Sequence, residues 1–294
     1  MNNTSNVSIG RVVEGRGGFY FVHDDDRVIM ATARGILKRD DQLIYVGDLV
    51  KYKILPNDEA VVTEIYKRNN FLARPPVSNL EMLVVVFAAA SPQVNYPVVD
   101  KLIAACEFKN IDVSICITKK DLVTEEELEE HLRIYENIYP TVSVNGITGE
   151  GIYDLMDIIR GKNVALAGPS GVGKSTIINH ITGEFSAETG SISERTGRGR
   201  HTTRHVEIFC LPDGTNVYDT PGFTSLDLPE VEITEVRKAF PEFRKLNLMC
   251  KYSDCIHINE PECAVKHALS EGKIGKTRYD SYCLMIDEVR KWQK

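Results

Sequence analysis

The sequence predicts three domains: a small β-barrel, an α/β domain on a parallel sheet, and a small helical domain around a metal. Three observations support this. Short strand patterns broken by turns fill the first part of the chain, strand and helix patterns alternate in the middle, and cysteines cluster with a histidine near the end. The chain has 294 residues, which is enough for each domain to bury a core. We expect the domains to span residues 1–71, 72–230 and 231–294.

The composition is that of a globular protein, with 43% apolar and 26% charged residues. No apolar run approaches the length of a membrane span, and the polar start lacks the features of a signal peptide. We therefore expect a cytoplasmic protein with no membrane partner, whose seven cysteines are thiols or metal ligands rather than disulfides. The net charge of −7 arises in the middle segment, so it does not exclude an RNA partner for the flanking segments.

The first segment carries about five strand patterns, the number expected of an OB-fold, which is a small closed barrel that often binds RNA. The strands are expected at residues 7–13, 19–22, 27–32, 46–52 and 60–66. The candidate RNA contacts are basic residues on a predicted loop and aromatic residues that offer stacking surfaces: Arg34, Lys38, Arg39, Phe19, Tyr20, Phe21 and Tyr45. The alternative is that the aromatic side chains fill the barrel and the basic ones are solvated surface.

The middle segment begins after Arg74-Pro75-Pro76, which is expected to be a linker because two prolines resist helix and sheet pairing. Strands are then predicted at residues 82–90 and 113–117, with a helix at 98–108 between them. Thr124 and Glu127 form a capping box that predicts a helix to about residue 138, and further strands follow at 141–144 and 164–167. This alternation predicts a doubly wound α/β domain.

The clearest motif is GPSGVGKS at residues 168–175, which matches the phosphate-binding pattern GxxxxGK[ST] between a buried strand and a helix. Its backbone N–H groups and the helix N-terminus favour phosphate oxygens. Lys174 is expected to reach the β- and γ-phosphates, and the Ser175 hydroxyl to bind Mg²⁺. The predicted phosphate-binding residues are Gly168, Pro169, Ser170, Gly171, Val172, Gly173, Lys174, Ser175 and Thr176.

A guanine-recognition motif is predicted upstream, at the end of the strand 113–117. Thr118, Lys119, Lys120 and Asp121 resemble the sequence NKxD, with threonine in place of asparagine. The Asp121 carboxylate can accept hydrogen bonds from guanine N1–H and the exocyclic amine, a pair that adenine lacks, while Lys119 lies along the base plane. Asn145 and Gly146 are weaker candidates for a loop that contacts guanine O6, and a plain turn explains them equally well.

A second nucleotide motif follows the phosphate loop. Asp219-Thr220-Pro221-Gly222 matches DxxG, in which the aspartate holds Mg²⁺ through water and the Gly222 N–H senses the γ-phosphate. The Gly- and Arg-rich run at 197–205 suits a switch loop, with Thr203, or its neighbour Thr202, closing on Mg²⁺. The base motif precedes the phosphate loop and DxxG, which is the reverse of the usual order and indicates a circular permutation.

The residue after Gly222 is Phe223, where many GTPases carry a glutamine that orients the attacking water. We therefore expect slow intrinsic hydrolysis, completed by another loop or by a partner. His201 is the candidate for this catalytic role because imidazole can polarise water near neutral pH. The alternative is a histidine at the surface or facing RNA.

The last segment contains Cys250, Cys255, His257 and Cys263, three thiolates and one imidazole that suit a closed structural zinc site. His267, one helical turn after Cys263, is a rival fourth ligand. A final helix is predicted with one apolar face. The remaining cysteines are expected in the core: Cys106, Cys116, Cys210 and Cys283.

A barrel, then TKxD, GPSGVGKS, GRGRHTTRH and DTPG in permuted order, then CxxxxCxHxxxxxC, together resemble the ribosome small-subunit-dependent GTPase A (RsgA, YjeQ or YloQ) family over nearly the whole chain. The resemblance implies a GTPase with one structural Zn²⁺ and Mg²⁺ bound with GTP. It also implies a role late in assembly of the 30S subunit, contact with 16S rRNA, and stimulation by the subunit. We expect a monomer. The alternatives are an RNA-binding assembly scaffold whose nucleotide is mainly structural, and an ATPase.

Overall fold

The structure, a computed structural model, describes residues 7–292 except 25–26, 34–42, 56–58, 190–205, 221–225 and 227. The chain divides into two compact units. The first comprises Met1–Glu81, Ile159–Ala165 and Ile181–Phe223, and the second Met82–Ile158, Leu166–His180 and Thr224–Lys294.

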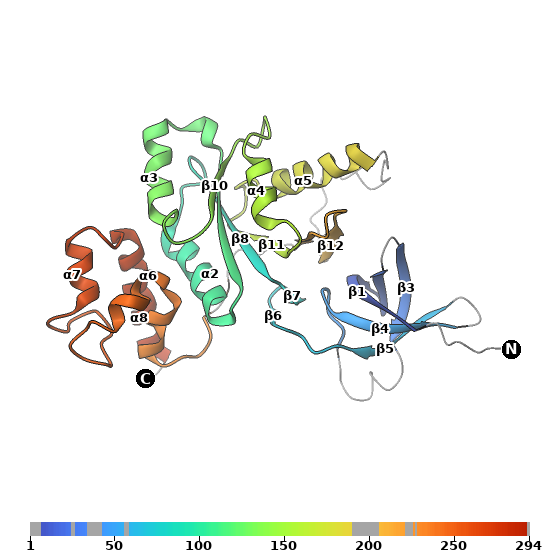
Figure 1. The fold of residues 1–294 in the computed structure, drawn as a ribbon, viewed down its shortest axis with the longest axis horizontal. Helices are drawn as coiled ribbons and strands as arrows, with labels where there is room; N and C mark the ends of the chain where they lie inside the picture. Colours follow the sequence, from blue (N-terminus) through green and yellow to red (C-terminus); the bar gives the residue numbers. More distant parts are fainter. Residues whose placement is uncertain are drawn as a thin grey trace. The chain divides into compact units, whose positions relative to one another are not determined.

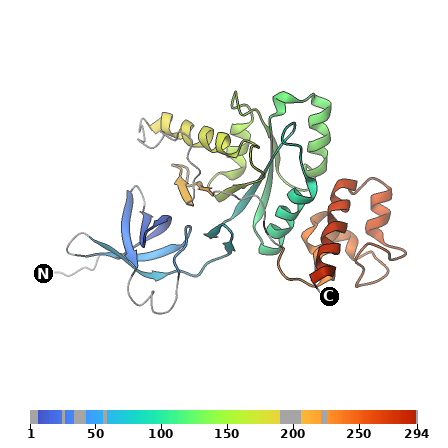
Figure 2. The ribbon, with the colours of Figure 1, turned by 180° about the vertical axis from the view of Figure 1, so that it is seen from behind.

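The first unit contains a closed five-stranded barrel, with the strands β1 (Val7–Arg16), β2 (Phe19–Asp24), β3 (Arg27–Ala33), β4 (Leu49–Ile54) and β5 (Ala60–Ile65). The strand order is β1-β2-β3-β5-β4, and β4 pairs back onto β1. These strands are the blue ones in Figure 2. Only β3 and β5 run parallel among these pairs. Alternate residues such as Val12, Val22 and Val62 fill the interior with no exposed surface, as a small barrel requires. The predicted OB-type barrel is confirmed.

The aromatic candidates of the barrel divide between its interior and its surface. Tyr20 packs against the barrel core, whereas Phe19 is 44% exposed. The Tyr45 ring lies 4.5 Å from the Phe71 ring, and the Arg68 guanidinium lies 4.7 Å from the Tyr45 centroid. Of these three aromatic residues, only Tyr20 therefore fits the alternative prediction that the side chains fill the barrel. The basic candidates Arg34, Lys38 and Arg39 lie outside the described residues.

The expected linker at residues 74–76 is wrong in one respect, because it forms a hairpin. β6 (Phe71–Ala73) and β7 (Pro76–Ser78) pair antiparallel, with Arg74 and Pro75 in the turn. Proline is tolerated here because the turn and an edge position need no N–H donor. The first unit also holds β12 (Glu207–Cys210) and β13 (Asn216–Asp219), which pair antiparallel, while β13 runs parallel to the first residues of β11 (Asn163–Ala167).

The second unit contains the parallel strands β8 (Met82–Ala88), β9 (Asp112–Thr118) and β10 (Thr141–Val144), in the order β10-β9-β8. The helices between them are α2 (Tyr96–Lys109) and α3 (Glu125–Tyr135), and α4 (Ile152–Ile159) follows β10. All seven residues of β8 are buried, as expected for a strand covered on both faces. The Thr124–Glu127 capping box is confirmed, and α3 ends at Tyr135 rather than near residue 138.

The C-terminal part of the second unit is helical, with the 3-10 helix η2 (Ile233–Ala239), α6 (Pro241–Asn247), α7 (Ala264–Ser270) and α8 (Lys276–Trp292). Figure 1 shows α2 beside this group, and the apolar core of the group includes Ala104 of α2. Tyr282, Ile286 and Val289 of α8 are fully buried, so the predicted apolar face of the last helix is confirmed. Among the described residues, no helix combines the length and the apolar character needed to cross a membrane.

Candidate nucleotide site and metal centre

The phosphate loop connects the last residues of β11 to α5 (Lys174–Thr189). Gly168 is required at its start, because its φ is 152° and a Cβ there would lie 2.0 Å from the carbonyl oxygen of Val86 in β8. Gly173, with φ of 100°, is required for conformation rather than space, since the nearest side-chain atoms to a Cβ there are 3.9 Å away. The loop is therefore built against the buried backbone of β8.

Lys174 and Ser175 are the first two residues of α5, where the phosphate loop ends. The Lys174 ammonium donates to the carbonyls of Gly168 at 2.7 Å and Pro169 at 2.8 Å, and burial lowers its pKa. Ser175 and Thr176 are exposed. An ammonium on the loop and a hydroxyl at the helix start are the groups that the predicted roles need.

The predicted base loop lies against the phosphate loop. Thr118, 54 residues before Val172 in the chain, places its Oγ1 2.5 Å from the Val172 carbonyl oxygen. Lys119 has a left-handed backbone, and its ammonium donates to the Ser91 carbonyl. Asp121 lies in the 3-10 helix η1 (Lys120–Leu122) and is exposed. Two loops that are distant in sequence thus share one edge of the second unit, as a nucleotide site requires.

The loop at residues 145–151 is fixed to both of these segments. The Lys120 ammonium lies 2.7 Å from the Glu150 carboxylate, and His180 of α5 places Nε2 2.9 Å from the Gly146 carbonyl oxygen. The Asn145 carboxamide oxygen accepts from two backbone N–H groups of its own turn, at 2.9 and 3.2 Å. This use of the side chain favours the plain turn over a base contact for Asn145. The sequence did not predict the contacts of Lys120 with Glu150 and of His180 with Gly146, because no spacing pattern indicates contacts of this kind.

The other predicted nucleotide residues belong to the first unit or lie outside the described residues. Asp219 ends β13, as expected for the strand before DxxG. Gly222, Thr203 and His201 lie outside the described residues, as do Thr202 and Phe223. Their predicted roles stay predictions.

The four predicted zinc ligands come together in the second unit, with all their ligand atoms within 4.8 Å of one another. The His257 Nδ1 atom lies 3.3 Å from the sulfurs of Cys255 and Cys263 and 3.6 Å from that of Cys250, and the Cys250 and Cys263 sulfurs are 4.0 Å apart. A tetrahedral zinc with ordinary bond lengths places two sulfurs about 3.8 Å apart and a sulfur and a nitrogen about 3.6 Å apart. The cluster therefore fits one zinc ion.

Neighbouring groups hold the zinc ligands in place. Tyr279 and Tyr282 of α8 donate to the carbonyls of His257, at 2.6 Å, and Ile256, at 2.8 Å. Burial lowers the pKa of His257 to about 4, which keeps its imidazole neutral, as a metal ligand must be. His267 is wrong as the rival fourth ligand, because its side chain is exposed and pairs with Glu271.

The other cysteines match the sequence prediction in part. Cys106 and Cys116 are buried, and burial raises the pKa of the Cys116 thiol to about 12. Cys210 and Cys283 are only half-buried. All seven cysteines lie in the described residues, and none of them forms a disulfide.

A buried charge cluster joins α2 and α3 to the helices around the zinc site. The Arg278 guanidinium of α8 donates to Asp100 of α2 at 2.6 Å and to Glu242 of α6 at 2.9 Å, and the Tyr135 hydroxyl of α3 donates to Asp100 at 2.9 Å. The side chains of Arg278 and Asp100 are 1% and 0% exposed. A second tie between α2 and α8 joins Lys101 and Glu288 at 2.6 Å. Sequence reasoning missed the cluster, although Asp100 stands out as a charge on an otherwise apolar helix face.

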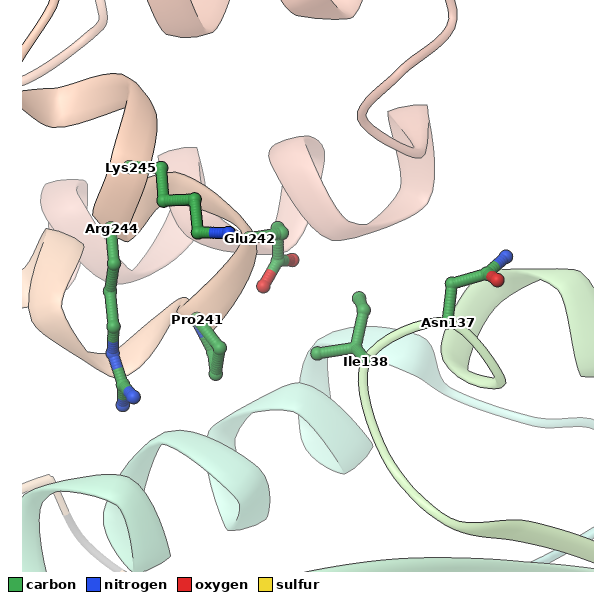
Figure 3. A pocket seen from close by; sticks show the side chains of 6 residues that line it. All are labelled: Asn137, Ile138, Pro241, Glu242, Arg244 and Lys245. Carbon is green, nitrogen blue, oxygen red and sulfur yellow. The ribbon is translucent and has the colours of Figure 1, made fainter.

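A pocket lies near this cluster, between the segment after α3 and α6 (Figure 3). Its lining residues are Asn137, Ile138, Pro241, Glu242, Arg244 and Lys245. None of the predicted nucleotide or zinc residues is among them. Glu242 is bonded to Arg278, and Arg244 pairs with Glu107, so two of its charged groups already have partners in the chain.

The chain contains, in order along the sequence, a barrel, a base loop, a glycine-rich phosphate loop in a parallel α/β fold, and a cluster of three cysteines and a histidine that fits zinc. This combination defines a circularly permuted P-loop GTPase. Family models agree with this class. The RsgA GTPase model matches residues 65–229, and the RsgA N-terminal domain model matches residues 9–62. The chain belongs to the RsgA GTPase family and is a GTP-hydrolysing enzyme.

Relatives and solved structures agree over nearly the full length. The chain is 40% identical over 286 residues to the small ribosomal subunit biogenesis GTPase RsgA of Caldanaerobacter subterraneus, covering 97% of each chain. A Clostridium perfringens protein of the same name is 39% identical, covering 95% of this chain and 97% of its own. The YjeQ crystal structure from Thermotoga maritima matches with a TM-score of 0.83 and 32% identity, over 96% of this chain and 98% of that one. YloQ, a circularly permuted GTPase, matches with 0.82 and 30%, over 99% and 98%.

Proposed function

We propose that this GTPase acts late in the assembly of the 30S ribosomal subunit, and that the subunit stimulates its hydrolysis of GTP to GDP and phosphate. The relatives named above are small ribosomal subunit biogenesis GTPases, which supports the proposed pathway. The observation in this chain that supports a guanine nucleotide is the Thr118–Val172 contact. It joins the base loop, which contains Asp121, to the phosphate loop. The protein would work as a monomer in the cytoplasm, with its barrel and zinc domain on 16S rRNA.

The proposed roles follow the chemistry of the residues. Asp121 reads guanine, with Lys119 along the base, and Lys174 holds the phosphates. The Ser175 hydroxyl and the Asp219 carboxylate, both oxygen donors of the kind that Mg²⁺ prefers, would hold the ion, which neutralises phosphate charge when bound.

The remaining roles fall on residues outside the described ranges, and they rest on the sequence motifs. Gly222 and Thr203 hold the γ-phosphate in the GTP state and relax after cleavage, which is a change from order to disorder. His201 orients the attacking water. The γ-phosphate is present only in the GTP state, so contacts of Gly222 and Thr203 with it would distinguish the two nucleotide states.

The deciding experiment is GTP hydrolysis titrated with purified 30S subunits, beside Lys174→Ala as a variant without the phosphate-binding ammonium. We expect the subunits to raise the turnover of the wild type and not of the variant. If the subunits change neither the turnover nor the nucleotide affinity of the wild type, the result would favour the scaffold alternative. Asp121→Asn tests the base separately, because it should shift preference from guanine toward xanthine nucleotides, whereas an ATPase would show no such shift.

A further inference from the structure

The predicted zinc ligand His257 has an uncommon backbone conformation. Its φ is 58°, in the left-handed region, which costs free energy for a residue that carries a Cβ. The side chain is fully buried, and its Nδ1 atom lies 3.3 to 3.6 Å from the three cysteine sulfurs of the cluster. Because the direction of a side chain depends on φ, the left-handed backbone is part of what aims this imidazole at the metal position.

The second ring nitrogen of His257 indicates that the imidazole is oriented through its backbone. Histidines that bind metals almost always donate this other ring N–H to a carboxylate, a carbonyl or water. The Nε2 atom of His257 is buried and has no hydrogen-bond partner in the part of the chain that the structure describes. The rings of Phe243 and Tyr282 pack near the imidazole, with centroids 5.9 and 6.2 Å from its own. This packing restricts the ring, while the hydrogen bonds that fix the residue are those of its backbone.

The Glu260 carboxylate holds the peptide groups on both sides of His257. One of its oxygens accepts from the Ile256 N–H at 2.8 Å. The other accepts from the N–H groups of Ile258, at 2.9 Å, and Asn259, at 3.1 Å. Hydrogen bonds from backbone N–H groups to a charged carboxylate are stronger than those between neutral groups. A single side chain thus bridges the residue before the zinc ligand and the two residues after it.

Two tyrosines of α8 bind the carbonyls of the same loop. Tyr282 donates to the Ile256 carbonyl at 2.8 Å, and Tyr279 donates to the His257 carbonyl at 2.6 Å. The His257 carbonyl and the N–H of the next residue belong to one planar peptide, so Tyr279 and Glu260 hold the two sides of that peptide. The peptides before and after His257 are both fixed, and its φ and ψ are fixed with them.

We propose that Glu260 is a positioning residue for the zinc ligand His257: its carboxylate holds the left-handed backbone that aims Nδ1 at the metal. Both of its oxygens accept from backbone N–H groups, so it acts through the histidine rather than as a ligand. The proposal rests on zinc as the ion of the cluster. It predicts that loss of the carboxylate weakens zinc binding by disturbing the nitrogen ligand.

The test measures the zinc affinity of the full chain by competition with a chromophoric chelator. Glu260→Ala removes all three hydrogen bonds and should raise the zinc dissociation constant about 10- to 100-fold, as loss of a group that orients a metal ligand does. Glu260→Gln keeps one acceptor oxygen and should lose less. Glu262→Gln is the matched control, because the Glu262 carboxylate is exposed and pairs with Lys251; it should bind zinc within about threefold of wild type.

Two further measurements separate positioning from general stabilisation of the fold. The visible absorption of bound Co²⁺ reports the ligands and the geometry of a site, so it should change in Glu260→Ala and stay as in wild type in Glu262→Gln. The second measurement repeats the zinc titration in a His257→Ala background. Because Glu260 acts through the histidine, adding Glu260→Ala there should weaken zinc binding by less than about threefold.

Three results would overturn the proposal: wild-type zinc affinity in Glu260→Ala, an unchanged cobalt spectrum in that variant, or the same loss of affinity with and without His257. If Glu260→Ala does not fold, Glu260→Gln and Tyr279→Phe decide, since each removes part of the hydrogen bonding of this loop and should raise the zinc dissociation constant by up to about tenfold. Wild-type affinity in both would also overturn it. A wild-type chain that binds no zinc would overturn the metal assignment as well, whereas the other results overturn the role of Glu260 alone.

Discussion

Replacing Arg278 by methionine should loosen the helices around the zinc site from α2. Methionine fills much of the same volume, so the main loss is the charge that faces Asp100 at 2.6 Å and Glu242 at 2.9 Å. Removing one partner of a buried ion pair costs about 3–5 kcal/mol, because the other charge stays buried without compensation. We expect a loss of that size, since the Asp100 side chain has no exposed surface and Tyr135 alone would remain to donate to the same carboxylate oxygen.

The measurement is urea unfolding at saturating zinc, followed by the fluorescence of Trp292, the one tryptophan of the chain, at the end of α8. Arg290→Met is the matched control on the same helix. Its pair with Asp287 is exposed and should contribute no more than about 1 kcal/mol. The double variant Asp100→Asn with Arg278→Met removes both charges, so it should recover about 2 kcal/mol of the loss.

The loss should also depend on pH, with a sign that follows from Asp100. Burial raises the pKa of the Asp100 carboxyl, and the Arg278 charge opposes that rise. Without Arg278 the folded-state pKa rises further above the unfolded value of about 3.9, so the folded variant takes up a proton that the unfolded chain does not. The loss of unfolding free energy in Arg278→Met should be complete at high pH and should shrink as pH falls through the folded-state pKa of Asp100. A deficit no larger than that of Arg290→Met, or one that is the same at pH 5.5 and 8, would refute the reasoning.

Four further predictions concern the metal, the phosphate loop and α3. Cys255→Ser should reduce bound zinc, measured by mass spectrometry, well below one per chain, while His267→Ala keeps it, because only the former lies in the cluster; equal zinc in both would contradict the site. Gly168→Ala should lower stability by about 2 kcal/mol and abolish tight GDP binding, since its Cβ meets a β8 carbonyl at 2.0 Å, and wild-type affinity would disprove the close approach. Thr124→Ala should cost about 1 kcal/mol in thermal unfolding through the lost cap of α3. The backbone N–H of Thr124 lowers the pKa of Glu127, so the stabilisation by Glu127 should be present above its unfolded pKa and be lost as pH falls through the folded value; a Glu127→Gln variant with the same melting profile as wild type across that range would contradict this.

Local patterns predicted most of what forms locally. The capping box at Thr124 placed the start of α3, and the glycine pattern placed the phosphate loop between a strand and a helix. The choice between His257 and His267 as fourth ligand needed coordinates, because both spacings are compatible with zinc.

Features that depend on distant residues could not be predicted. Arg278 and Asp100 are 178 residues apart, and no periodicity links a charge on one helix to a charge on another. The hydrogen bond of Thr118 was also hidden, since nothing in the sequence shows that its hydroxyl donates to the carbonyl of Val172, 54 residues further along the chain. Prolines at 75 and 76 suggested a linker from composition alone. The pairing of β7 with β6 depends instead on register, which composition does not reveal.

The apolar packing of α2 has a practical consequence for dividing this protein into fragments. Ala104 of α2 is buried within the same cluster as Phe240, Phe243 and Tyr282, and Phe108 packs against that cluster. A fragment that ends near residue 230 would expose this side of α2 to water, and an isolated C-terminal fragment would lack part of its own interior. Truncation would therefore yield two sticky pieces instead of two working modules, and point substitutions in the intact chain are the sounder way to ask what each end contributes.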